Sequence, residues 1–342
     1  MKPNSSPILS KELRIHLGKL GPCQRTGRGL EKRLKDILPL LFELPISSVV
    51  RTENEIVAAC EPFLWYLDTT FIDRLFRRRN LISSLLNQHD TLKYILLFHR
   101  DGRIREAALS KITGGLPSPF IASAIAWRMN DWVPQVRSAA EECATRTFPK
   151  TNAQIIAEAA SRLLTSTGNW HRWTVERKIL AESYQRADVA EHLVNILKTR
   201  RSGSLSKLLR QALRGESLDI HLLDLARNAN QPHVRLIAIE TILNEQAHWP
   251  VGRIWLWVNK PDGIRRKVVK FESRPVKAEF PYKAALKLGL SDKSPVVRRA
   301  AIQALLDNRH KFENSEQLAK TMLADTSPAV RERAEFILRP SS

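Results

Sequence analysis

The sequence is poor in the residues that build disulfide frameworks, metal clusters and β-rich folds. It contains only three cysteines, Cys23, Cys60 and Cys143, which lie far apart and form no Cys-x-x-Cys pair. We therefore expect them to be small buried hydrophobic side chains, with no zinc or redox role. Thirteen glycines and four tyrosines supply few of the turn and strand residues of an all-β protein.

Long apolar runs are also missing. The longest, such as residues 37–42 and 94–98, are far shorter than the roughly 20 residues that cross a bilayer. The N-terminus reaches Lys11 without the apolar run of a signal peptide. We therefore expect no membrane span and a cytoplasmic location.

Acidic residues are scarce, because 35 Asp and Glu stand against 55 Lys and Arg, which gives a net charge of +20. With 43% hydrophobic and 26% charged residues, the composition is that of a globular protein and excludes a disordered polycation. The excess is concentrated: segments 1–87, 198–214 and 247–280 carry +5, +6 and +5, whereas the rest of the chain carries only +4. The charge therefore indicates particular surfaces.

A motif repeats along the chain at a regular interval. Its first two copies contain Arg105 and Arg137, and the distance between these two arginines is one period of the repeat. The motif consists of Asp or Asn, then Pro, then Val-Arg or a similar pair, then small and apolar residues. From Arg137, the successive gaps to Arg235, Arg298 and Arg331 correspond to three, two and one such periods. In the copies, an apolar helix ends, Asp or Asn caps the next helix, and Pro occupies the first turn, whereas the looser copy at 101–108 has no Pro. The copies run over residues 101–108, 131–140, 230–238, 292–302 and 325–334.

Each copy with the helix before it predicts a helical hairpin. In the long gap between Arg137 and Arg235, helical periodicity predicts two degenerate hairpins. One pairs residues 153–164 with 172–184, and the other pairs 189–197 with 205–213.

These motifs resemble HEAT repeats, specifically the short prokaryotic type related to the HEAT-like repeats of phycobilin lyases, over roughly residues 88–339. The resemblance implies an all-α fold, a right-handed α-solenoid of stacked hairpins with a long concave face. It also implies a structural ladder between repeats, formed by the turn Asp and the Arg six positions later. That pattern covers Asp131 with Arg137, Asp292 with Arg298, and Asp325 with Arg331; Asn230 with Arg235 and Asp101 with Arg105 depart from its spacing.

Two segments lie outside the regular repeats. Residues 1–87 lack the motif but predict helices over 29–41, 53–66 and 71–86, which would cap the solenoid. Residues 247–280 break the period: two strand-like runs flank a Pro-Asp-Gly turn and favour an inserted β-hairpin. The alternative is a degenerate repeat. The predicted organisation is a cap over 1–87, repeats over 88–246, a basic insertion over 247–280, and repeats over 281–342.

The basic segments supply the candidate binding residues. Lys207, Arg210 and Arg214 share one face of a predicted helix, which in HEAT-like proteins is the helix that lines the concave surface. Arg200 and Arg201 precede it. In the insertion, the candidates are Arg265, Arg266 and Lys267, opposite Trp255 and Trp257, where the indoles either bind cations and bases or pin the hairpin to the repeats. The run Arg77-Arg78-Arg79 is a solvated helix face by the simplest interpretation.

Motifs of known enzymes are missing from the sequence. It has no phosphate-binding Gly-x-x-x-x-Gly-Lys loop, no His-Glu-x-x-His and no Gly-x-Ser-x-Gly. The nine histidines are scattered. We therefore expect no metal site and no small-molecule cofactor.

One enzymatic alternative remains, because some glycosylases that remove alkylated purines from DNA are built from HEAT-like repeats. Trp127 and Asp131 are four positions apart, and Trp170 lies one repeat later, with Trp132 and Trp173 beside them. In such a site, indoles would stack on a modified base while the carboxylate stabilises an oxocarbenium ion. The simpler interpretation gives Asp131 the turn position of its repeat.

The sequence therefore predicts a non-catalytic HEAT-like scaffold that binds a polyanion, in first place DNA or RNA. A scaffold for an acidic protein is the alternative, and a DNA glycosylase is the third. Convergence of basic residues from the three segments on the concave face would favour nucleic acid, and their dispersal would favour a protein scaffold.

Overall fold

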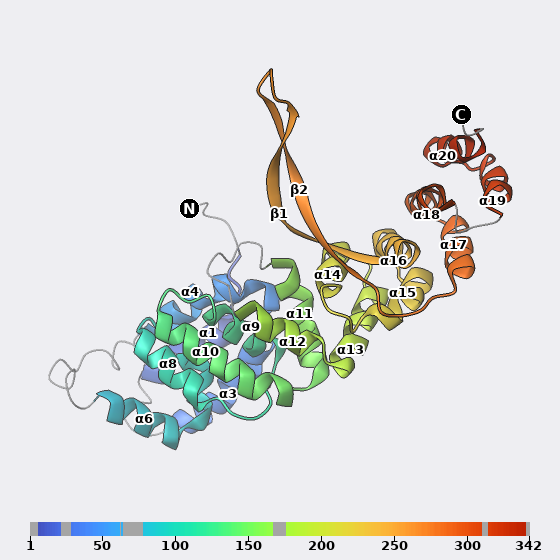
Figure 1. The fold of residues 1–342 in the computed structure, drawn as a ribbon. Coiled ribbons are helices and arrows are strands. Elements are labelled where there is room, and N and C mark those ends of the chain that lie inside the picture. Colours follow the sequence, from blue (N-terminus) through green and yellow to red (C-terminus); the bar gives the residue numbers. More distant parts are fainter. Residues whose placement is uncertain are drawn as a thin grey trace. The chain divides into compact units, whose positions relative to one another are not determined.

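The computed structural model describes residues 6–21, 29–61, 63, 78–166, 176–309 and 314–339. The chain forms two compact units, residues 1–184 and 185–342. Both are built from helices, and among the described residues unit 2 alone adds a two-stranded antiparallel sheet (Figure 1). The boundary between the units lies within the predicted repeat block 88–246. The predicted division of the chain into segments 1–87, 88–246, 247–280 and 281–342 stays a prediction.

Unit 1 stacks its helices in neighbouring pairs, with α8 on α10, α9 on α11 and α4 on α9. The sequence explains the stacking, since the helices bury apolar side chains against one another, while α9 is buried nearly all round and the charged Arg105 and Arg128 are buried with it. Cys60 and Cys143 are fully buried, as predicted, and Cys23 lies outside the described residues. The helices are α1 (Lys11–Gly18), α3 (Leu30–Phe42), α4 (Val49–Ala59), α6 (Arg78–Gln88), α7 (Lys93–Leu96), α8 (Gly102–Lys111), α9 (Pro119–Arg128), α10 (Pro134–Thr147), α11 (Ala153–Ser166) and α12 (Glu176–Tyr184).

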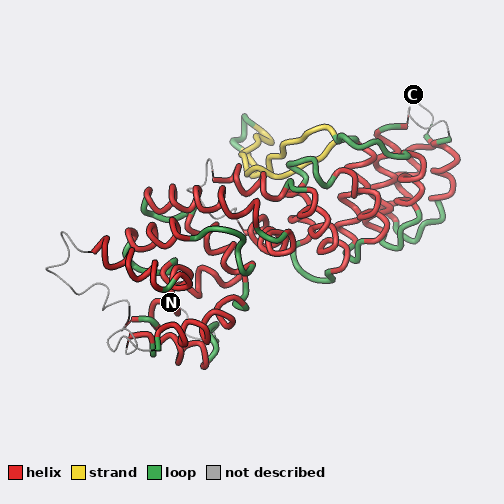
Figure 2. Tube along the Cα trace, turned by 90° about the horizontal axis from the view of Figure 1, so that it is seen from below, coloured by secondary structure: helices red, strands yellow, loops and turns green. Residues whose placement is uncertain are grey.

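The described part of unit 2 consists of helical hairpins and the β-hairpin. The second helices of three successive hairpins, α16, α18 and α20, pack directly on one another. Figure 2 shows the strands beside the stacked helices. The elements are α13 (Ala187–Thr199), α14 (Leu205–Ala212), α15 (Leu222–Asn228), α16 (Pro232–Asn244), β1 (Gln246–Asn259), β2 (Ile264–Pro275), α17 (Tyr282–Leu290), α18 (Pro295–Asp307), α19 (Ser315–Met322) and α20 (Pro328–Leu338).

The predicted hairpin insertion is confirmed, and it explains the long interval between the motif arginines Arg235 and Arg298. That interval does not hold two repeats, as the period predicted. Helix α16 packs on α17 and α18 of the next hairpin, so the interval comprises a single repeat step plus the strands β1 and β2. The chain leaves and rejoins the stack at neighbouring points, because the Val276 amide donates to the Glu245 carbonyl at 3.0 Å.

In three of the repeats the turn between the helices differs from the predicted cap. Pro134, Pro232, Pro295 and Pro328 begin their helices as expected. Asp131, Asp292 and Asp325 are not N-cap residues, because each lies two positions before the cap, whereas Asp101 caps α8 as predicted and accepts from the Arg103 amide at 2.9 Å. Asp292 Oδ1 accepts from the Ser294 amide at 2.7 Å, in an Asx-type turn. The carboxylate fixes the turn in this way, and its second oxygen accepts from Arg235 of a neighbouring repeat, which also binds Oδ1.

Arginines of the motif use that second oxygen. Arg298 Nη1 donates to the carbonyl of Asp292, six positions earlier, at 2.9 Å, and its Nε donates to Asp325 Oδ2 of the following repeat at 2.6 Å. The two motifs with the other spacing take part as well, since Arg105 binds Asp131 and Arg235 binds Asp292 through two nitrogens each. The predicted ladder is therefore present, with Arg105, Arg235 and Arg298 each pairing with the Asp of the next repeat.

Candidate binding surface on the hairpin and helix α14

The base of the β-hairpin is locked to the loop after α14 by one buried ion pair. The guanidinium of Arg274 donates to both carboxylate oxygens of Asp219, at 2.8 and 2.6 Å. It also donates to the carbonyls of Leu213, at 3.0 Å, and Gly215. The side chain of Asp219 is almost fully buried, and the pair fixes where the strands leave unit 2.

Helix α14 supplies a second set of contacts to the hairpin base. Arg210 lies with its guanidinium carbon 5.8 Å from the centre of the Phe271 ring and pairs with Glu240 of α16 at 3.3 Å. Arg214 lies 6.0 Å from the centre of the Trp249 ring and donates to the Pro250 carbonyl at 3.4 Å. Both arginines are half-buried. Each guanidinium is therefore partly engaged in contacts that hold the hairpin base against α14.

Beyond this base the hairpin is exposed on both sides. Residues 251–258 of β1 and 264–267 of β2 are all exposed, and the free part of β1 is about 27 Å long at ~3.4 Å per residue. A register shift between Pro250 and Gly252 marks the point where the ribbon leaves the helices. Figure 1 shows β1 and β2 extending away from α14 and α16. An isolated ribbon of two strands is marginally stable, so its own cross-strand contacts matter.

One side of the ribbon, the indole face, carries Arg253, Trp255, Trp257, Arg265, Lys267 and Val269, which the register places side by side. The guanidinium carbon of Arg265 lies 4.7 Å from the Trp255 ring centre and 5.9 Å from the Trp257 ring centre. Lys267 Nζ lies 5.9 Å from the Trp255 ring centre. These cation–π contacts tie the two strands together. The indoles therefore stabilise the ribbon, and none of their described contacts pins them to the helices.

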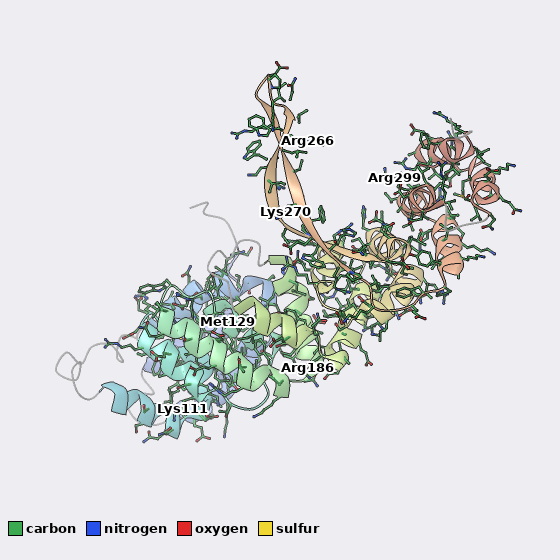
Figure 3. All side chains as sticks on the ribbon, in the orientation of Figure 1. Lys111, Met129, Arg186, Arg266, Lys270 and Arg299 are labelled. Carbon is green, nitrogen blue, oxygen red and sulfur yellow. The ribbon has the colours of Figure 1, made fainter. Side chains whose placement is uncertain are left out.

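The opposite side, the aliphatic face, carries Ile254, Leu256, Ile264, Val268, Arg266 and Lys270. Ile254, Leu256 and Ile264 are 45, 47 and 52% exposed. Figure 3 shows Arg266 and Lys270 on the ribbon, with Lys270 nearer to the helices. Among residues 251–271 the only acidic side chain is Asp262, in the turn, where it accepts from Asn259 Nδ2 at 2.5 Å. Both faces of the ribbon are thus cationic.

The structure brings some of the predicted basic residues together and separates others. Arg210 and Phe271 connect α14 to the indole face, so the second and third basic segments meet there. Arg200 and Arg201 precede the N-terminus of α14, the end opposite Arg214. Lys207 is exposed on α14. Lys198, in the same basic segment, pairs with Asp224 of α15, in the next hairpin, at 2.8 Å.

The candidate glycosylase site lies around Asp131 in unit 1. Both carboxylate oxygens of Asp131 are engaged in a network of hydrogen bonds. Asp131 Oδ1 accepts from Arg105 Nη2 at 2.7 Å and from the Val133 amide at 3.0 Å, and Oδ2 accepts from Arg105 Nε at 2.9 Å and Arg128 Nη1 at 3.1 Å. Burial raises the pKa of Asp131, but these bonds and the two arginine charges outweigh burial and hold the pKa below its ordinary value. The carboxylate thus stays ionised and engaged, as its turn position predicts.

Trp127 and Trp132 line the same cleft as Asp131, and among the described contacts no hydrogen bond joins either indole to that carboxylate. Trp127 Nε1 donates to Glu53 of α4 at 2.9 Å, and Arg128 Nη2 reaches the same carboxylate at 2.5 Å. Trp132 is 70% exposed. A cleft of about 520 Å³ borders these residues. Trp170 and Trp173 lie outside the described residues, as does Arg77. Sequence spacing alone could not reveal that Glu53 joins the N-terminal helices to this network, because it lies 74 residues from Trp127.

Two further observations bear on the expected absences. No group of three His, Cys, Asp or Glu within the described residues is placed to hold a metal ion. None of the helices in the described ranges is both long and apolar enough to span a membrane.

Comparison with known proteins supports the repeat resemblance. Residues 283–305, which cover most of α17 and α18, match the family described as a HEAT repeat associated with sister chromatid cohesion. The chain has no significant match among curated proteins. The match supports a HEAT-repeat family in general terms and, with it, a scaffold that binds partners.

Proposed function

We propose that this chain is a non-catalytic HEAT-repeat scaffold that binds a polyanionic partner, in first place nucleic acid. The binding surface would comprise the indole face of the hairpin with Lys207 and Arg210 of α14. HEAT repeats of the short prokaryotic type, stacked as a right-handed solenoid, would carry this surface. The observation that supports the proposal is the contact between Arg210 and Phe271, which joins two separate basic segments of the sequence into one surface.

The charge of the ribbon supports a polyanion. Between residues 251 and 271, six Lys and Arg side chains stand against Asp262 alone. Such density attracts phosphates without sequence preference, and the resulting affinity depends strongly on salt. The indoles, each about half exposed, could add stacking with bases, although Arg265 and Lys267 already occupy part of their ring faces.

A titration tests this proposal. A short fluorescent duplex and the corresponding single strand are titrated with the full chain at several salt concentrations, by fluorescence anisotropy. Replacing Arg265→Glu and Lys267→Glu together should abolish measurable binding at moderate salt. The milder pair Arg265→Gln and Lys267→Gln should lower the salt slope by about two, because each phosphate contact contributes roughly 0.9.

The control removes equal charge elsewhere in unit 2. Lys283 and Lys287 are exposed on α17, so Lys283→Glu with Lys287→Glu should leave most of the affinity intact. Equal losses in the two double variants would reduce the effect to net charge, and unchanged binding in the hairpin variant would refute the proposed surface.

The acidic-protein alternative has its own support. Exposed aliphatic side chains do not contribute to binding phosphates. The hairpin presents a row of such side chains on its aliphatic face.

A further inference from the structure

We propose that the aliphatic face of the hairpin docks a protein whose surface is apolar at its centre and carries carboxylates. The face consists of Ile254, Leu256, Ile264 and Val268 with Arg266 and Lys270. This inference is independent of the proposed polyanion site, which lies on the opposite side of the same ribbon.

The first argument is the pattern of side chains along the strands. An antiparallel sheet with one side toward water normally alternates between apolar and polar residues. Here Ile254 and Leu256 alternate with Arg253, Trp255 and Trp257, so neither side is polar in the usual way. Soluble proteins rarely expose contiguous apolar surface without a binding role. The aliphatic residues are therefore best explained by a partner that covers them.

The second argument is that the hairpin does not need these residues for its own stability. The base is held by Arg274 with Asp219 and by Arg210 and Arg214. The strands are joined by the contacts of Arg265 with both indoles. On the aliphatic face, Ile254 and Val268 form one apolar cross-strand pair, but Leu256 stands opposite Arg266, and Gly252 stands opposite Lys270. These two mixed pairs contribute little to strand association, because their charged ends extend into water.

The third argument concerns the chemistry of the partner. Arg266 lies on β2 between Ile264 and Val268, two positions from each, so its charge is at the centre of the apolar row. A partner that covered the row without a carboxylate would desolvate this guanidinium without compensation, at a large energetic cost. A carboxylate can accept two parallel hydrogen bonds from it and so fix the register of the complex.

The same charges argue against a second copy of this chain. The aliphatic face has Arg266 and Lys270 and no acidic residue, so two such faces in contact would oppose four cations. Like charges brought together across an interface are strongly unfavourable. A lipid surface is also disfavoured, because the turn at the end of the ribbon carries Asn259, Lys260 and Asp262, which would have to enter the bilayer first.

A site-specific crosslinking experiment identifies the occupant. A photoreactive benzophenone side chain replaces Leu256 in the full chain, in cells of the source organism, and Ala284 on α17, which is exposed, serves as the control position. We expect one protein to crosslink at position 256 and not at position 284. That protein is then purified and titrated against the full chain by calorimetry.

Binding should weaken more than tenfold in Leu256→Asp and in Arg266→Glu, and a Lys substitution of the partner's central carboxylate should restore binding to the Arg266→Glu chain. Lys283→Gln, at an exposed position on α17, should leave it unchanged, and near-ultraviolet circular dichroism checks that each variant keeps its hairpin. Crosslinks only to a second copy, to lipid or to nucleic acid, an absence of crosslinks, or equal affinity in Leu256→Asp would each overturn the proposal.

Discussion

Arg235 on α16 holds Asp292 in a two-point ion pair, with Nε and Nη2 at 2.7 and 2.9 Å from the two carboxylate oxygens, although 57 residues separate them in sequence. The whole β-hairpin lies between these two residues along the chain. The pair joins the repeat before the insertion to the repeat after it, so the insertion leaves the stacking of helices intact. The hairpin is therefore an addition to one side of a continuous stack.

This ion pair should be important for the stability of unit 2. Asp292→Asn removes the charge that compensates Arg235, whose side chain is 4% exposed, and we expect a loss of about 3 kcal/mol in the free energy of unfolding. Urea denaturation followed by far-ultraviolet circular dichroism measures it. The adjacent Lys293→Gln, at an exposed position, is the control and should change stability by less than about 0.5 kcal/mol. A loss no larger than that of the control would show that the pair contributes nothing net.

Stability should fall at low pH because of the ladder carboxylates. At Asp292, burial raises the pKa but the Arg235 pair outweighs it; at Asp325, the Arg298 hydrogen bond is the main cause; both pKa values lie below the ordinary value of 3.8. A carboxyl whose pKa is depressed in the folded state contributes stability above its unfolded pKa and loses it as pH falls through the folded pKa.

We therefore expect constant ladder stability above about pH 5 and a progressive loss below about pH 4. Urea midpoints measured across this range test the expectation. The double variant Asp292→Asn and Asp325→Asn should be less stable at pH 7 and show a shallower decline on acidification. An equally steep decline in that variant would assign the acid sensitivity to other carboxylates.

The projecting part of the hairpin should be removable without unfolding the repeats. Residues 251–270 are replaced by Asn-Gly, which forms a tight turn between the paired residues Pro250 and Phe271. The anchor of Arg274 on Asp219 is kept. We expect the melting temperature to change by only a few degrees, and the polyanion affinity and the crosslinked partner to be lost together. Loss of the helical circular dichroism signal would instead mean that the ribbon stabilises the stack.

Asp131 should matter for stability and not for chemistry. Because both oxygens are engaged and the partner Arg105 is 3% exposed, Asp131→Asn should cost about 3 kcal/mol in the free energy of unfolding of unit 1. The full chain should release no base from alkylated DNA, as measured by chromatography of the freed purine. Release that disappears in a folded Asp131→Asn variant would favour the glycosylase alternative.

Local signals in the sequence were sufficient to predict many of the helices. Residues 153–164 and 205–213 were predicted from apolar spacing, and the structure places α11 and α14 there. Gly263, with a positive φ of 69° in the Pro-Asp-Gly turn, likewise made the hairpin predictable. In each case, neighbouring residues carry the signal, because helix periodicity and turn geometry are properties of a short stretch of chain.

Contacts between distant residues were beyond such reasoning. Arg210 and Arg214 were assigned to a ligand from their shared helix face, but both contact the hairpin base, which comes much later in the chain. The ladder between adjacent repeats was predicted, but the sequence did not show that Arg298 binds the backbone carbonyl of its own Asp292 and the carboxylate of Asp325 in the following repeat. A charged side chain on a helix face has the same sequence pattern whether water, a ligand or another element meets it.

By itself, the sequence determined the repeat motif, the helical hairpins and the turn that reverses the β-ribbon, because capping, proline placement and apolar periodicity act over a few residues. Only the tertiary structure decided that α16 and α18 stack across the insertion, that Asp131 is enclosed by Arg105 and Arg128, and that the ribbon has an indole face and an aliphatic face. Those features depend on which side chains meet in space, and burial and strand register set that.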